Sequence, residues 1–158
     1  MRYIDTGLDR PRWRATLTFR LHQRLQIGVE ANPVVGEVVP LATLFLLTEG
    51  ETRPALFLGT SSDRVGSPEG TQAFYLTFAK YLPLLRLSPY VSLNYSEWDA
   101  GWNVPFGASL ELGGGFYLRP MYDGHKSHLV GGVFRERWGF GLLWVWYETS
   151  GVFVSFGF

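Results

Sequence analysis

The last part of the chain carries the clearest alternation of apolar and polar positions. Apolar side chains occupy every second position of segments 138–147 and 152–158, and a polar segment with one glycine, 148–151, separates them. This two-residue period is that of a β-strand with two unlike faces, and a short polar turn joins such strands into a hairpin. The pattern therefore predicts a terminal β-hairpin with one aromatic face.

The same period recurs along the rest of the chain. In segment 13–21, Leu17 and Phe19 share one face while Arg14 and Thr16 share the other. A helical period is sustained nowhere, so we expect a single all-β domain over residues 1–158. The predicted strands are 2–8, 13–21, 25–32, 38–48, 54–61, 72–82, 86–96, 105–122 divided at the glycines 113–115, 128–134, 138–147 and 152–158.

The connections between these strands alternate in length. The short ones are 22–24, 49–53, 83–85, 113–115 and 135–137; the others are 9–12, 33–37, 62–71, 97–104, 123–127 and 148–151. Transmembrane β-barrels alternate in this way, with short turns on one side of the membrane and longer loops on the other. We therefore predict a closed antiparallel up-and-down transmembrane β-barrel, most simply of twelve strands, with ten or eight if short segments merge.

Charged residues lie in the middle of several predicted strands, opposite the apolar row. They are Arg14, Arg20, Glu30, Glu111 and Arg119; Lys80 is an exception, since it shares its face with apolar residues. A polar interior inside an apolar outer wall is the arrangement of a barrel in lipid. A soluble calycin-like barrel or a β-sandwich, with charges outside and an apolar core, is the alternative.

The final strand supports the membrane interpretation. Phe156 and Phe158 end a run with apolar residues at every second position, and this run resembles the last strand of bacterial outer-membrane β-barrels. The resemblance implies an outer-membrane location and the barrel assembly machinery as a partner during biogenesis, with these two phenylalanines as the assembly signal. It also implies that the aromatic residues of the hairpin face membrane lipid. They are Trp138, Phe140, Trp144 and Trp146.

A second resemblance lies in the middle of the chain. Segment 46–50, followed by Pro54, Gly59, Asp63 and Lys80, is similar to a strand–turn–strand pattern of YjbH-type barrels, which are linked to exopolysaccharide production. The spacing after Gly59 is one residue longer than in that pattern. The resemblance implies a role beside a polysaccharide and transfers no active site.

Composition excludes several classes of function. The formal net charge is zero, so no footprint of a nucleic-acid-binding protein is present. The absence of cysteine excludes disulfides and thiolate metal sites, and no cofactor motif is found. No apolar run is long enough for a spanning helix, and no signal-peptide pattern precedes the first strand. A barrel of this kind would therefore be a processed or re-engineered form, or a segment of a longer precursor.

Two groups of residues are candidates for a functional role. Arg14, Arg20, Glu30, Glu111 and Arg119 could line a pore, but we expect them to pair with one another and fill the lumen, because unpaired charges in a narrow lumen are costly. The loop with Trp98, Asp99 and Trp102 mixes acids with aromatic rings and should project from the barrel. It is the candidate site for recognition of a glycan or another envelope protein.

A hydrolytic site is the third possibility. His125, Ser127, His128 and Glu136 resemble the His–Ser–Glu set of outer-membrane lipid A deacylases, but Glu136 should lie at the far end of the strand that follows Ser127. A serine nucleophile needs an adjacent base and an orienting group, so catalysis is not expected. The two histidines and Asp123 form only a weak metal pattern, and no metal is predicted.

These observations favour a non-enzymatic outer-membrane barrel that serves as a structural, anchoring or assembly component of the envelope. The alternatives are a small passive channel and a lipid-modifying enzyme with its site at the rim.

Overall fold

The computed structural model describes residues 1–157, except for the side chains of residues 10 and 11. Phe158, half of the predicted assembly signal, lies outside the described residues. The strands are β1 (Arg2–Ile4), β2 (Trp13–His22), β3 (Leu25–Asn32), β4 (Glu37–Leu47), β5 (Ala55–Ser62), β6 (Gln72–Ala79), β7 (Leu87–Ser96), β8 (Gly101–Asn103), β9 (Phe106–Gly113), β10 (Phe116–Tyr122), β11 (Ser127–Arg135), β12 (Trp138–Val145) and β13 (Thr149–Phe156). The helices are α1 (Asp9–Arg12) and a short 3₁₀ turn, Pro83–Leu85. Neither of these described helices is long and apolar enough to cross a membrane.

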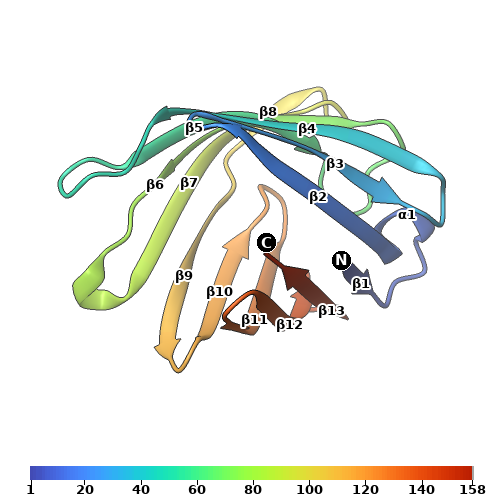
Figure 1. Cartoon of the computed structure of the whole chain (residues 1–158). Helices are drawn as coiled ribbons and strands as arrows, with labels where there is room; N and C mark the ends of the chain where they lie inside the picture. The colour runs from blue at the N-terminus through green and yellow to red at the C-terminus, as the bar shows by residue number, and fades with distance from the viewer. Residues whose placement is uncertain (158) are drawn as a thin grey trace.

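The strands form one closed antiparallel barrel (Figure 1). Each wall strand pairs with its neighbours in sequence, β6 pairs with β7, and β13 pairs with β1, so the sheet closes on itself with twelve strands. The remaining strand, β8, pairs with one part of β7 and β9 pairs with another part of it. The two strands therefore share one place in the wall, and β8 is not counted among the twelve. The prediction of a closed up-and-down barrel of twelve strands is confirmed.

The two ends of the barrel differ. One end, here called the loop end, carries the connections 5–12, 33–36, 63–71, 97–105, 123–126 and 146–148. The other, the turn end, carries 23–24, 48–54, 80–86, 114–115 and 136–137. The three longest connections, 5–12, 63–71 and 97–105, lie at the loop end, but 48–54 and 80–86 at the turn end are longer than 33–36, 123–126 and 146–148, so the alternation in length predicted from the sequence holds only in part.

The outer face of the wall is apolar. Leu17, Phe19 and Leu21 of β2 are each about 60% exposed, although they are large hydrophobic side chains. In β12 the outward positions are Trp138, Phe140, Leu142 and Trp144, all exposed, while Gly139 between them and Val145 at the end of the strand are buried. Large apolar side chains on the outside of the wall are compatible with a barrel that is surrounded by lipid.

Trp146 departs from the predicted outward row. β12 ends at Val145, and Trp146 and Tyr147 both have positive φ, 57° and 58°. The N–H of Glu148 donates to the carbonyl of Val145 at 3.0 Å, which closes a tight turn within the three-residue hairpin loop 146–148. The turn therefore lies two residues earlier than the polar segment predicts, and the Trp146 indole reaches Asp123, with Nε1 at 3.4 Å from Oδ2.

Aromatic rings on the inner face lie against glycine backbones. A Cβ on Gly141 would lie 2.3 Å from the Phe153 ring and 2.4 Å from the carbonyl oxygen of Gly131. Neither neighbour can give way easily, because one is a packed ring and the other is backbone of the adjacent strand. Gly141 is therefore required for close packing of β11, β12 and β13.

We expect Gly141→Ala to destabilise the barrel by about 1–3 kcal/mol, the usual cost of overpacking. The matched control is Gly131→Ala on the neighbouring strand, where a Cβ would meet nothing closer than 3.6 Å. Equilibrium unfolding in detergent, monitored by intrinsic fluorescence, compares the two. Equal stability of both variants would contradict the packing role of Gly141.

Candidate functional site

The polar chemistry of this barrel is concentrated at the loop end. The connection between β5 and β6, residues 63–71, is called the plug loop here. Its first half turns inward: Asp63 and Ser67 are buried, whereas Pro68, Glu69 and Gly70 are exposed. A connection that extended freely into solvent would expose both halves, so this loop is folded into the mouth of the barrel.

The plug loop reaches across the mouth. A Cβ on Gly66 would lie 3.4 Å from Trp146 Cη2 and 3.6 Å from Leu8 Cδ1. Four strands separate the two hairpins in either direction around the barrel: β4, β3, β2 and β1 on one side, and β7, β9, β10 and β11 on the other. Contact between Gly66 and Trp146 therefore spans the full width of the mouth, and the two connections close it together.

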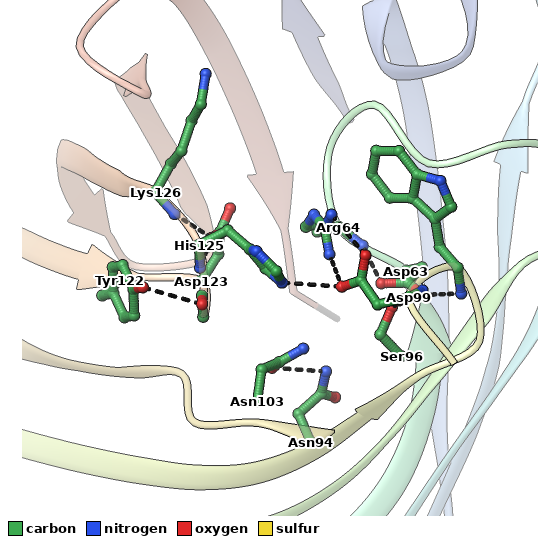
Figure 2. Close-up of polar contacts among 12 residues, drawn as sticks. Asp63, Arg64, Asn94, Ser96, Asp99, Asn103, Tyr122, Asp123, His125 and Lys126 are labelled. Atoms are coloured by element: carbon green, nitrogen blue, oxygen red, sulfur yellow. Dashed lines mark hydrogen bonds and ion pairs between the residues drawn. The ribbon is translucent and has the colours of Figure 1, made fainter. Parts of the chain in front are cut away.

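Arg64 holds the plug loop to the connection 97–105, as Figure 2 shows. The Arg64 guanidinium donates two hydrogen bonds to the Asp99 carboxylate, with Nη2 at 2.9 Å from Oδ1 and Nη1 on Oδ2. His125 Nε2 lies 2.8 Å from the same Oδ2. These hydrogen bonds, first those from Arg64, hold the pKa of Asp99 below its ordinary value of 3.8. One carboxylate thus joins three of the loops.

Asp63 fixes the base of the plug loop (Figure 2). Its Oδ2 accepts hydrogen bonds from the Ser96 hydroxyl at 2.7 Å and from the N–H of Trp98 at 3.2 Å. Its Oδ1 accepts from the N–H of Arg64 at 2.8 Å. Ser96 is fully buried, so these bonds are shielded from water. At the far end of the loop, the N–H of Gly70 donates to Glu37 Oε1 at 2.6 Å.

A second carboxylate organises the opposite side of the mouth. Asp123 Oδ2 lies 2.7 Å from His128 Nε2, and Oδ1 accepts from the N–H groups of His125 and Lys126 at 2.8 and 2.7 Å. Burial raises the pKa of Asp123, but the hydrogen bonds from His128 and the two N–H groups outweigh burial and lower it to about 2. The Lys126 ammonium lies 4.3 Å from the Trp146 ring centroid, a cation–π contact.

The predicted lumen residues do face inward, but most do not pair with one another. Arg14 Nε lies 3.0 Å from Glu30 Oε1, the one ion pair among the five predicted residues within the described part of the chain. Arg20 lies over the Phe45 ring at 4.8 Å, and Arg119 Nε donates to the Ser109 hydroxyl at 2.6 Å. Glu111 accepts a hydrogen bond from the Tyr81 hydroxyl at 3.2 Å. Apart from the Arg14–Glu30 pair, these charges are held individually by aromatic and hydroxyl groups.

Two cavities lie along the inner wall. The larger, about 450 Å³, is toward the turn end and includes Arg86, Ser88, Glu111, Tyr117 and Arg119. The smaller, about 210 Å³, lies beneath the plug loop. It is lined by groups from both halves of the barrel: Arg2, Arg14, Ser62, Asp63, Arg64, Val65, Met121, Asp123, His128, Val130, Leu143 and Val145.

The predicted recognition loop is divided between two positions. Asp99 binds Arg64 and His125 at the mouth of the barrel. Trp98 lies under Arg64, whose guanidinium carbon is 4.2 Å from the ring centroid. Trp102 is in β8 on the outer face, 69% exposed, beside Tyr95 at a centroid distance of 5.3 Å. The three residues therefore do not form one projecting surface.

The residues of the hydrolase pattern are also separated. Ser127 is exposed at the start of β11, while Glu136 follows the other end of that strand, in the turn to β12. His128 is engaged with Asp123 and His125 with Asp99. Among residues 1–157, no group of three or more His, Cys, Asp or Glu side chains is arranged to hold a metal ion.

Sequence reasoning missed Arg2, Asp63, Arg64 and Ser96. All but Arg2 lie in or next to connections, where no two-residue period shows which way a side chain points. The single available signal was composition, because the plug loop contains an arginine beside an aspartate within an otherwise small and polar segment.

No protein-family model, curated protein or solved structure matches this chain. Its function is therefore argued from its own residues and geometry.

The hydrogen bonds to the Asp123 carboxylate should make the stability of the barrel depend on pH. The folded pKa of Asp123 is depressed from 3.8 to about 2, so its contribution is present above pH 4 and is lost as the pH falls toward 2. We expect Asp123→Asn to lower the unfolding free energy by on the order of 2 kcal/mol at pH 6 and to have little effect at pH 2. Unfolding curves of both proteins across this range test the expectation. A difference that does not depend on pH would contradict it.

Proposed function

We propose that this chain is an integral outer-membrane β-barrel that acts as a non-enzymatic structural or anchoring component of the envelope. The observation that carries the membrane part is the apolar outer wall of a closed barrel, with charged and hydroxyl side chains inside. In water such a wall would be an aggregation surface, whereas in lipid it needs no cover. The proposed partners are membrane lipid, the barrel assembly machinery, and a further envelope component, either a protein or a polysaccharide.

The closed mouth favours an anchor over a channel. The plug loop crosses the mouth and is held there by Asp63, Arg64 and Glu37, at both of its ends. A passive porin needs a continuous aqueous path, and the plug loop lies across that path at the loop end. The barrel therefore presents its outer wall and its loop end as surfaces, while the lumen serves stability.

Adjacent residues on β2 test the membrane location. Phe19 points outward and Thr18 inward, and both are exposed in the absence of lipid. We expect Phe19→Arg to reduce folding stability in lipid vesicles by about 2–4 kcal/mol if Phe19 lies near the bilayer midplane, because an arginine there must be buried in hydrocarbon. Thr18→Arg, the matched control, should have a much smaller effect because it places the charge in the lumen.

The comparison is made by urea titration of protein refolded into vesicles, read out by tryptophan fluorescence and by gel mobility with and without heating. A heat-sensitive mobility shift is expected for the folded barrel. Equal effects of the two substitutions, or monodisperse protein in buffer without detergent, would contradict the membrane location.

Removal of the plug loop tests the anchor against the channel. The N–H of Asp63 donates to the carbonyl of Thr71 at 3.2 Å, so residues 64–70 can be replaced by a two-residue Asn-Gly turn without separating β5 from β6. In planar bilayers we expect no stable conductance steps from the unmodified protein and stable steps from the shortened one. The control replaces only the exposed residues 68–70 by one glycine, and we expect it to show no stable conductance steps. Stable steps from the unmodified protein would support a passive channel and overturn the anchor.

A further inference from the structure

One charged group inside the barrel lacks a partner. Arg2, on β1, lies opposite Arg14 on one side and Phe153 on the other, so its side chain points into the lumen. Its Nε and Nη2 atoms are buried and find no hydrogen-bond acceptor within the described residues. Burial of a charged group without a counter-charge or hydrogen bonds is costly. Such a group therefore marks a place where a ligand of opposite charge would be stabilising.

The carboxylates near Arg2 are already engaged. Glu30 accepts from the Ser62 hydroxyl and pairs with Arg14, and no ion pair joins it to Arg2. Both oxygens of Asp63 accept from Ser96 and from backbone N–H groups. Asp123 is held by His128 and by N–H groups of its own loop. Glu30 attracts the Arg2 guanidinium from a distance, but none of the three accepts a hydrogen bond from Nε or Nη2 of Arg2, and the neighbouring Arg14 adds a second positive charge.

We propose that the 210 Å³ cavity beneath the plug loop binds an oxyanion group, a phosphate or a carboxylate, held by the guanidinium of Arg2 beside that of Arg14. The planar guanidinium presents paired N–H donors that match two oxygens of such a group. Arg2 belongs to β1 and Arg14 to β2, so the bound anion bridges the strand that closes the barrel to its neighbour. The anion would thus stabilise closure of the barrel.

The anion can come from two sources. Arg2 also lines a second cavity of about 340 Å³ at the seam of β1, β2 and β13, where its neighbours are the apolar residues Tyr3, Trp13, Val152 and Val154. A lipid headgroup could reach Arg2 from this side with its acyl chain against the apolar residues, whereas a free anion would enter through the lumen. The chemistry at the guanidinium is the same in both cases.

The experiment measures the unfolding temperature of the barrel in a nonionic detergent. One arm adds inorganic phosphate against sodium chloride of equal ionic strength, and the other adds phosphatidylglycerol to the micelles. We expect one arm to raise the unfolding temperature by about 5–10 °C at a hundredfold excess over the dissociation constant, and the arm that does so identifies the source. The shift should vanish in Arg2→Gln and persist in the control Arg53→Gln, whose arginine lies in the exposed turn between β4 and β5.

Without any anion, Arg2→Gln should be at least as stable as the unmodified protein, because it removes an uncompensated buried charge. Isothermal titration of the unmodified protein with phosphate and with phosphatidylglycerol micelles keeps the proposal testable if Arg2→Gln does not fold. Saturable binding that Arg14→Gln weakens at least about tenfold would support the site. Absence of saturable binding in both titrations, or a shift that Arg2→Gln retains, would overturn it.

Discussion

The structure depends on closure of the barrel by the shortest of its twelve wall strands. β1 contains three residues, Arg2–Ile4, yet it pairs with β13 on one side and β2 on the other. A sheet with an open edge exposes unpaired N–H and C=O groups, and the hydrocarbon of a membrane provides nothing to satisfy them. Ile4 is fully buried at this seam. The three residues of β1 thus complete the wall (Figure 1). Every other wall strand is longer; β8 is as short, but it pairs with β7 in line with β9 and is not a separate wall strand.

Closure also determines where the polar groups lie. In a closed barrel the inward half of every strand faces a shared lumen, so charges that are distant in the sequence become neighbours. At the loop end they are matched: Arg64 with Asp99 and His128 with Asp123. Toward the turn end, Arg20 and Arg119 lie over aromatic rings and no carboxylate pairs with them among the described residues. The side-chain pairs of Asp99 and Asp123 thus tie the loops together at the loop end, whereas the turn end combines stacked arginines with the pair of Lys80 and Glu49, Nζ to Oε1 3.3 Å.

The wall could be predicted from the sequence because its period is regular. The inward and outward positions of β2, β3, β7 and β12 agree with the alternation in the chain, since a two-residue period leaves each side chain only one face. The predicted strand 2–8 was too long, because Asp5 onward turns toward α1 instead of pairing with β2. The turn at Trp146 was misplaced because a bulky aromatic with positive φ is a poor turn former, and contacts with Asp123 and Lys126 offset that preference.

The mouth could not be predicted in the same way, and the reason is physical. Inside the wall, backbone pairing fixes the register, and successive side chains of a strand point to opposite faces. The direction of one side chain therefore determines the direction of the next. In the plug loop the direction of Arg64 depends on Asp99, which is 35 residues away and in another connection. Such a contact depends on the closed barrel, which brings the two connections together. The geometry of the mouth is therefore set by tertiary contacts between distant connections instead of by a local period.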